Sequence, residues 1–309
     1  MTRPVLPTRR AVLAGLAAGG AVSALPLPSR AQAAFLTKAI PSTGERIPVV
    51  GLGTWVTFNV GRDPRALDRC AEIMRHFFEG GGTLIDSSPM YGSAQNTIGY
   101  GLEKLGRTDR GVFSADKVWT SSVSRGPAQI EESRRHWTMP RFDLLQVHNL
   151  RAWQGHLKTL FEMKEAGEVR YVGITTSDGR AHEEFLKVMR TQPLDFIQVT
   201  YNPVDREVEE RILPLARDRG MAVIANRPYR HSRLIDFVQR HPLPGWAEEA
   251  DAQNWPEFLL KYIVSHPAVT CAIPATSQIE HVRENIRAAY GRLPDEATRW
   301  RMAAHVESL

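Results

Sequence analysis

The 309-residue sequence has little cysteine, no low-complexity segment and no recurring long apolar run. Two cysteines cannot form the disulfide framework that holds a small secreted domain together. The 23 glycines are too few for a collagen-like repeat, and a composition with 42% hydrophobic residues excludes a disordered chain. The lack of several apolar stretches of about 20 residues excludes a protein with many membrane spans. What remains is a globular protein with a large core.

After residue 33, the chain has no marked excess of either positive or negative charge. The formal net charge is +5, but Arg3, Arg9, Arg10 and Arg30 stand in a stretch without any acidic residue. Without the first 33 residues, the chain keeps 35 basic and 34 acidic residues. This balance gives no support for a polyanionic partner, so we expect no nucleic acid to bind.

The first 33 residues have the pattern of an export signal. Arg9 and Arg10 precede apolar residues 11–27, and residues 31–33 form a small-x-small cleavage pattern that ends at Ala33. The arginine pair favours the twin-arginine class. We therefore expect the twin-arginine export machinery as a partner, a periplasmic location, and no stable membrane span after cleavage. A membrane anchor formed by an uncleaved signal is the alternative.

From residue 34 to residue 309, strand-like and helix-like patterns alternate eight times. Eight strand–helix units in a chain of this length favour a single-domain α/β fold, the (β/α)8 TIM barrel, over an open doubly wound sheet. The strands are expected at 49–55, 83–86, 112–118, 143–148, 169–175, 196–201, 222–226 and 270–274, and the helices at 64–79, 94–105, 129–137, 155–166, 181–190, 207–219, 255–265 and 280–289.

Three more segments have expected places around such a barrel. A hairpin over 35–48, with its turn at 42–44, would close the bottom of the barrel. The long irregular stretch 227–253 follows the seventh strand, so it would hang over the C-terminal face, where barrels bind substrates. A tolerated surface insertion is the other interpretation of this stretch. Residues 294–308 predict one extra surface helix.

Four side chains with acid–base chemistry end or follow neighbouring strands. Asp86 ends the second strand, Tyr91 lies five residues later, Lys117 lies at the end of the third strand, and His148 ends the fourth. Each alone has a structural explanation, such as a helix cap, loop packing, a solvated charge or a buried imidazole. Together they would meet at the C-terminal mouth of the barrel, where barrel enzymes hold their catalytic residues.

Short motifs around these positions, and at further positions along the chain, also indicate a known protein family. These motifs lie at 51–55, 81–86, 91–92, 116–119, 143–148, 167–174, 198–202, 273–274 and 284–285. In these motifs and their order, residues 34–309 resemble the aldo-keto reductase family. The resemblance implies that Tyr91 is the general acid–base, that Lys117 and Asp86 support it, and that His148 orients the carbonyl group. The implied activity is hydride transfer that reduces aldehydes or ketones, or oxidises the corresponding alcohols.

These residue types suit carbonyl reduction. A carbonyl oxygen that accepts a hydride gains negative charge and needs a proton donor. Free tyrosine has a pKa of about 10, and we expect the ammonium group of Lys117 to lower the pKa of Tyr91 while Asp86 keeps the lysine charged. No protein side chain supplies a hydride, so a nicotinamide cofactor is implied.

The resemblance also assigns residues to this cofactor. We expect NADP(H) rather than NAD(H), bound tightly before export because free nucleotide is scarce outside the cytoplasm. Arg227 stands where many members have an aromatic residue, and Ala275 stands where many NADP-preferring members have a lysine. The assigned residues are Thr175, Thr176 and Gln198 at the carboxamide, Asn226 and Arg227 at the nicotinamide ring, and Thr276, Ser277, Glu284 and Asn285 at the adenosine end.

Trp55 and Trp119 are expected to line an apolar substrate pocket. Neither histidine nor cysteine has the spacing of metal ligands, so no metal site is expected, and Cys70 and Cys271 have the pattern of isolated buried thiols. Two other functions stay open. One is an exported nucleotide-binding or sensory module with little turnover, and the other is an unrelated barrel in which Lys117 forms a Schiff base, as in an aldolase.

Overall fold

The computed structural model describes residues 35–108 and 110–309, and the expected export signal at 1–33 lies outside this part of the chain. Eight parallel strands pair in sequence order from β3 to β10. Isolated bridges between Val50 and Ala272 and between Gly53 and Ala275 join the first of these strands to the last. The eight strands are β3 (Leu52–Gly53), β4 (Leu84–Asp86), β5 (Phe113–Val118), β6 (Phe142–Val147), β7 (Val169–Thr175), β8 (Phe196–Thr200), β9 (Ala222–Asn226) and β10 (Cys271–Ala272).

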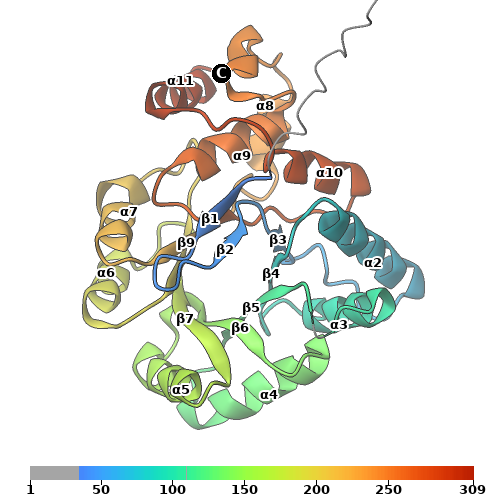
Figure 1. Ribbon diagram of the computed structural model, residues 1–309, viewed down its shortest axis with the longest axis vertical. Coiled ribbons are helices and arrows are strands. Elements are labelled where there is room, and N and C mark those ends of the chain that lie inside the picture. Colours follow the sequence, from blue (N-terminus) through green and yellow to red (C-terminus); the bar gives the residue numbers. More distant parts are fainter. Residues whose placement is uncertain (1–34, 109) are drawn as a thin grey trace, which may run out of the picture. The chain divides into compact units, whose positions relative to one another are not determined.

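Helices surround this ring of strands, as Figure 1 shows. The arrangement is the expected (β/α)8 barrel, and every predicted strand and helix begins and ends within three residues of an observed one. The helices that follow successive strands are α2 (Pro64–Glu79), α3 (Ala94–Leu105), α4 (Gly126–Trp137), α5 (Trp153–Glu165), α6 (His182–Thr191), α7 (Val208–Asp218), α9 (Trp255–Ser265) and α10 (Ile279–Arg287).

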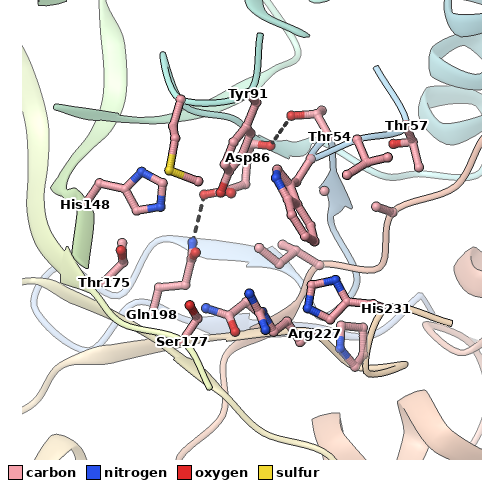
Figure 2. A pocket seen from close by; sticks show the side chains of 18 of the residues that line it. Thr54, Thr57, Asp86, Tyr91, His148, Thr175, Ser177, Gln198, Arg227 and His231 are labelled. Carbon is pink, nitrogen blue, oxygen red and sulfur yellow. Dashed lines mark hydrogen bonds between the residues drawn. The ribbon is translucent and has the colours of Figure 1, made fainter. Parts of the chain in front are cut away.

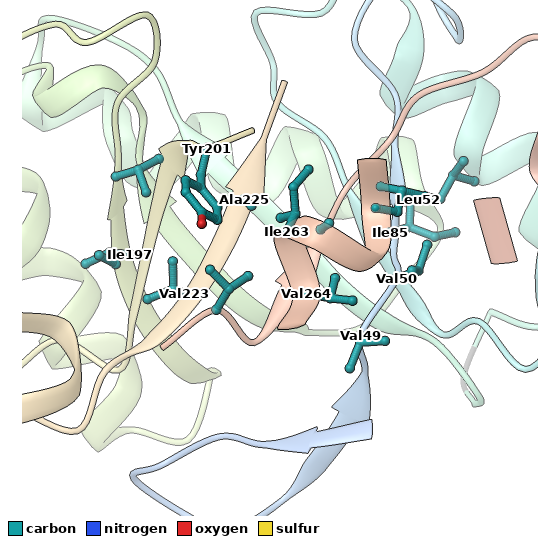
Figure 3. Packing of buried hydrophobic residues seen from close by; sticks show 14 of the residues in the cluster. Val49, Val50, Leu52, Ile85, Ile197, Tyr201, Val223, Ala225, Ile263 and Val264 are labelled. Atoms are coloured by element: carbon teal, nitrogen blue, oxygen red, sulfur yellow. The ribbon is translucent and has the colours of Figure 1, made fainter. Parts of the chain in front are cut away.

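Alternation of side chains along the strands creates two separate cores. Residues that point outward pack against the helices, and Figure 3 shows Val223 and Ala225 of β9 beside Ile263 and Val264 of α9. Residues that point inward fill the barrel as a second cluster, which includes Leu144. The strands are therefore fixed from both sides, and their C-terminal ends are held in rigid positions.

The predicted hairpin at the start of the domain is confirmed. Strands β1 (Thr37–Ala39) and β2 (Arg46–Pro48) pair antiparallel, and in Figure 1 they lie across the centre of the ring. Ile40 and Ile47 join the inner cluster of the barrel together with Phe113, the first residue of β5. The hairpin thus closes the N-terminal end of the barrel and leaves the opposite end open.

The stretch 227–253 is more regular than the sequence indicates. It contains the helix α8 (Arg233–Val238) and the 3-10 helix η3 (Gly245–Ala250). The predicted extra helix is present as α11 (Glu296–Glu307). In the described part of the chain, no helix has the length and apolar character needed to cross a membrane.

Candidate active site

A cavity of about 320 Å³ opens where the strands of the barrel end. It is lined by residues from the ends of β4, β7, β8 and β9 and from the loops that follow β3 and β6. Figure 2 shows Asp86, Tyr91, His148 and Gln198 around it, with Arg227 on the opposite side. The structure therefore brings Asp86, Tyr91 and His148, three of the four predicted catalytic side chains, to the lining of one cavity.

Asp86 and Lys117 form an ion pair that is almost completely buried. The Nζ atom of Lys117 lies 2.6 Å from Oδ2 of Asp86 and also donates to the carbonyl oxygen of Ser87, at 2.7 Å. The other carboxylate oxygen, Oδ1, accepts a hydrogen bond of 2.8 Å from Nε2 of Gln198. Burial alone would lower the pKa of Lys117, but the negative charge of Asp86 raises it above its ordinary value, so the lysine stays charged.

Tyr91 lies directly above this pair. Its ring centre is 5.0 Å from Nζ of Lys117, and its side chain lines the cavity. Burial raises the pKa of Tyr91 above its ordinary value, while Lys117 opposes this rise and Asp86 adds to it. Lys117 thus acts on the pKa of Tyr91 in the expected direction, but removal of the phenol from water outweighs the nearby ammonium group, and the net change is a rise.

A glycine fixes the turn that presents Tyr91. Gly92 has φ of 63°, which favours glycine, and a Cβ atom there would lie 2.3 Å from Oδ1 of Asn59. That same oxygen accepts a 2.9 Å hydrogen bond from the backbone N–H of Ser93. The loop from β3 therefore holds the start of α3 and positions Tyr91 over the mouth.

His148 faces Tyr91 across the cavity, with ring centres 5.7 Å apart and the planes 85° apart. Its Nδ1 lies 2.8 Å from Oγ of Ser88, which also accepts a hydrogen bond from the backbone N–H of Met90. Ser88 can donate its hydroxyl hydrogen to Nδ1, an arrangement that leaves the proton of the neutral ring on Nε2. Burial lowers the pKa of His148 to about 2, and the charges of Lys117 and Arg180 act in the same direction.

Five of the residues assigned to the cofactor line the cavity beside the tetrad, namely Thr175, Thr176, Gln198, Asn226 and Arg227. The hydroxyl of Thr176 is already used, since it donates to the carbonyl oxygen of Arg180 at 2.6 Å. Asn226 bridges neighbouring strands, because it donates to the carbonyl oxygen of Thr176 and accepts from Thr200. The hydroxyl of Thr175 accepts one backbone N–H and keeps its own hydrogen to donate.

Arg227 and Trp55 face each other at the entrance of the cavity. The Arg227 guanidinium lies 5.6 Å from the Trp55 ring centre and forms an ion pair with Asp178. His231 packs edge-on against Trp55, with ring centres 4.6 Å apart. Residues 227–229, 231 and 232 therefore line the mouth, which agrees with a functional interpretation for the beginning of the stretch 227–253.

Some predicted site residues lie elsewhere. Trp119 is not in the lining of the cavity, and its ring is covered by the guanidinium group of Arg151 at 5.1 Å. The adenosine-end residues also lie outside the lining, next to helix α10. Among them, Asn285 already accepts a 2.6 Å hydrogen bond from the hydroxyl of Tyr229 through Oδ1. The complete set outside the lining is Trp119, Thr276, Ser277, Glu284 and Asn285.

The residues of the site that the sequence analysis missed include Ser88, Arg180 and His231. Ser88 lies between Asp86 and Tyr91, and its position three residues before Tyr91 was the signal that could have found it. Arg180 and His231 stand in loops, where sequence gives no periodic pattern, and only the fold brings them to the cavity.

Comparisons with known proteins agree with this fold. Residues 49–301 match the Aldo/keto reductase family, so the chain belongs to that family. The chain is 28% identical over 207 residues to Aldo-keto reductase YhdN of Bacillus subtilis (strain 168), a match that covers 60% of this chain and 60% of the relative. It is 28% identical over 263 residues to the NADH-specific methylglyoxal reductase of Escherichia coli (strain K12), covering 73% and 78% of the two chains.

Among solved structures, an aldo/keto reductase from Klebsiella pneumoniae in complex with NADP and acetate has a TM-score of 0.70. The sequences are 24% identical, and the match covers 86% of this chain and 94% of the other. This likeness establishes the barrel fold.

We predict that His148 stays neutral, with its proton on Nε2, from pH 8 down to pH 5. Its folded-state pKa of about 2 lies far below the usual value of about 6.5. The unfolded chain binds this proton first as the pH falls below about 6.5, so acidification lowers the free energy of unfolding. The nitrogen chemical shifts of the His148 ring, followed as a function of pH, measure its protonation midpoint and show which nitrogen carries the proton. A protonation midpoint above pH 5, or a proton on Nδ1, would contradict the prediction.

Proposed function

We propose that this protein is a nicotinamide-dependent reductase of aldehydes and ketones, with Tyr91 as the general acid–base. The observation that carries the proposal is the meeting of the Tyr91 hydroxyl, a neutral His148 ring and the buried Lys117–Asp86 pair at one cavity. Family membership and the reductase names of the relatives support it.

Two hydrogen-bond donors can hold the oxygen of a carbonyl substrate. The Tyr91 hydroxyl donates from one side, and Nε2 of His148 donates from the other. As negative charge develops on the oxygen, Tyr91 transfers its proton, and the nearby ammonium group of Lys117 stabilises the phenolate that forms. Because the pKa of Tyr91 is raised, the phenol is protonated at neutral pH and ready for the reductive direction.

The polar atoms left free in the cavity fit a carboxamide group. The Thr175 hydroxyl has a hydrogen to donate, and Oε1 of Gln198 makes no hydrogen bond in the described part of the chain, whereas Nε2 of Gln198 is bound to Asp86. One donor and one acceptor are what the oxygen and the amino group of a carboxamide require. The nicotinamide cofactor would be held there and would supply the hydride.

We expect NADP(H) as the preferred nucleotide. Helix α10 has no side-chain cap at its N-terminus, where Thr276 and Ser277 precede it, and Arg283 lies on its exposed side. Backbone N–H groups at such a terminus bind phosphate. NAD(H) is the competing cofactor, since one relative is named an NADH-specific reductase and Ala275 offers no charge.

Substitution of Tyr91 by Phe is expected to reduce carbonyl turnover at least about a thousandfold and to change nucleotide affinity less than about twofold, because only the proton donor is lost. Absorbance of NAD(P)H with a panel of aldehydes measures turnover. Tyr100→Phe is the matched control, since Tyr100 lies on the surface side of α3 and bonds Asp68. Substantial activity of Tyr91→Phe would reject the role of Tyr91. Nucleotide binding without turnover by the unchanged protein would favour the sensory module.

Fluorescence quenching of the mature protein by both nucleotides measures the cofactor preference. NADPH is expected to bind at least about fivefold more tightly than NADH, because the extra phosphate gains charge-assisted hydrogen bonds. Arg283→Gln should remove much of this difference, whereas Arg190→Gln, on the distant helix α6, should leave it unchanged. Tighter binding of NADH would overturn the preference.

We further propose that the protein is exported through the twin-arginine route with its nucleotide already bound. Residues 1–33 carry the supporting sequence pattern. The test is to express the full chain in its natural type of host and to analyse the periplasmic fraction. We expect a mature chain that starts at Ala34 and retains nucleotide through dialysis. Replacement of Arg9 and Arg10 by Lys should keep the protein in the cytoplasm. A periplasmic protein without nucleotide would contradict tight binding, and an unchanged location of the variant would contradict the route.

A further inference from the structure

Positive charge is in excess around the mouth of the cavity. Among the described residues that line it, Asp86 is the one carboxylate, and Lys117 neutralises it at the base of the cavity. Arg180, in the loop after β7, and Arg227, in the loop after β9, line the same cavity. A ligand that enters between these loops therefore meets two guanidinium groups and no free carboxylate.

The carboxylate of Asp178 lies close to both Arg227 and Arg180. Asp178 forms an ion pair with Arg227 through Oδ1, and its other oxygen, Oδ2, lies 3.6 Å from Nη2 of Arg180. The contact with Arg180 is longer than a hydrogen bond, and the Arg180 side chain is 61% exposed. Asp178 thus compensates Arg227 first and leaves most of the charge of Arg180 available at the cavity.

Hydrogen bonds orient the guanidinium group of Arg180 but leave some of its N–H donors available for a ligand. Its Nε donates to the carbonyl oxygen of Ser177 at 3.1 Å, and its Nη2 donates to the Ser177 hydroxyl at 2.8 Å. Nη1 makes no hydrogen bond within residues 35–108 and 110–309. A planar group with fixed orientation and free N–H donors is suited to binding a carboxylate.

The charge of Arg180 also reaches the part of the cavity where the carbonyl group would be bound. It is one of the positive charges that hold the pKa of His148 low, together with burial and Lys117. A small molecule whose oxygen contacts His148 therefore lies within the electrostatic influence of Arg180. This relation connects the recognition of a charged group with the position of the reacting carbonyl.

We propose that the cavity selects carbonyl substrates that carry an anionic group, such as short oxo acids, and that Arg180 binds the carboxylate while Tyr91 and His148 bind the carbonyl oxygen. The proposal rests on the proposed reductase function and names its substrate class. Arg180 is a specificity-determining residue here, and it takes no part in proton transfer.

The test compares 4-oxobutanoate with its uncharged amide, 4-oxobutanamide, which has nearly the same shape. The unchanged protein is expected to have at least about fivefold higher kcat/KM for the acid, because a charge-assisted contact is added. Arg180→Gln should raise KM for the acid about fivefold to tenfold with little change in kcat, and should change the values for the amide less than about twofold. Arg180→Lys should restore part of the preference, which should shrink as the salt concentration rises.

Arg190→Gln is the control for a general change of charge, because this exposed arginine lies on α6 outside the cavity, and it should behave like the unchanged protein. Equal effects of Arg180→Gln on both substrates would overturn the proposal. A weakened affinity for nucleotide in Arg180→Gln, measured by fluorescence quenching, would assign this residue to the cofactor instead and would also overturn it. If the protein turned over neither of these two compounds and none of a panel of neutral aldehydes, the reductase function itself would be rejected, and the substrate class with it.

Discussion

The buried ion pair between Asp86 and Lys117 is the contact on which the candidate site depends. Burying two charges away from water destabilises the folded protein unless each charge is paired and hydrogen-bonded. Removing one partner of such a pair typically lowers the free energy of unfolding by about 3–5 kcal/mol. Here Gln198 and the carbonyl oxygen of Ser87 complete the hydrogen bonds. The pair therefore keeps a charged lysine beneath Tyr91 and ties together β4, β5 and β8 at their C-terminal ends.

The apolar side chains that stabilise the barrel and the polar side chains of the candidate active site lie at different places in it. Ile40 and Ile47 seal the N-terminal end with apolar contacts, whereas the cavity opens at the other end. Loops at that end carry Arg180, Arg227 and His231 and can vary without changing the two cores. Proton transfer and substrate recognition are thus assigned to different elements of one rigid frame.

Much of the fold and the tetrad could be predicted because each rests on a local pattern. Strand and helix periods are visible in sequence, and Asp86, Tyr91, Lys117 and His148 stand at strand ends that a barrel brings to one mouth. Trp119 lies outside the lining of the cavity, because the direction of a side chain beyond a strand end depends on its neighbours. Its ring packs under Arg151 instead.

The sequence by itself determined the barrel, the order of its units and the types of side chain at the C-terminal mouth. Only the tertiary structure decided how these side chains behave. Burial outweighs Lys117 and leaves Tyr91 with a raised pKa, Ser88 forms a hydrogen bond with Nδ1 of His148, and Asp178 lies closer to Arg227 than to Arg180. The physical reason is that desolvation and charge pairing depend on distances between segments far apart in the chain, which no local pattern encodes.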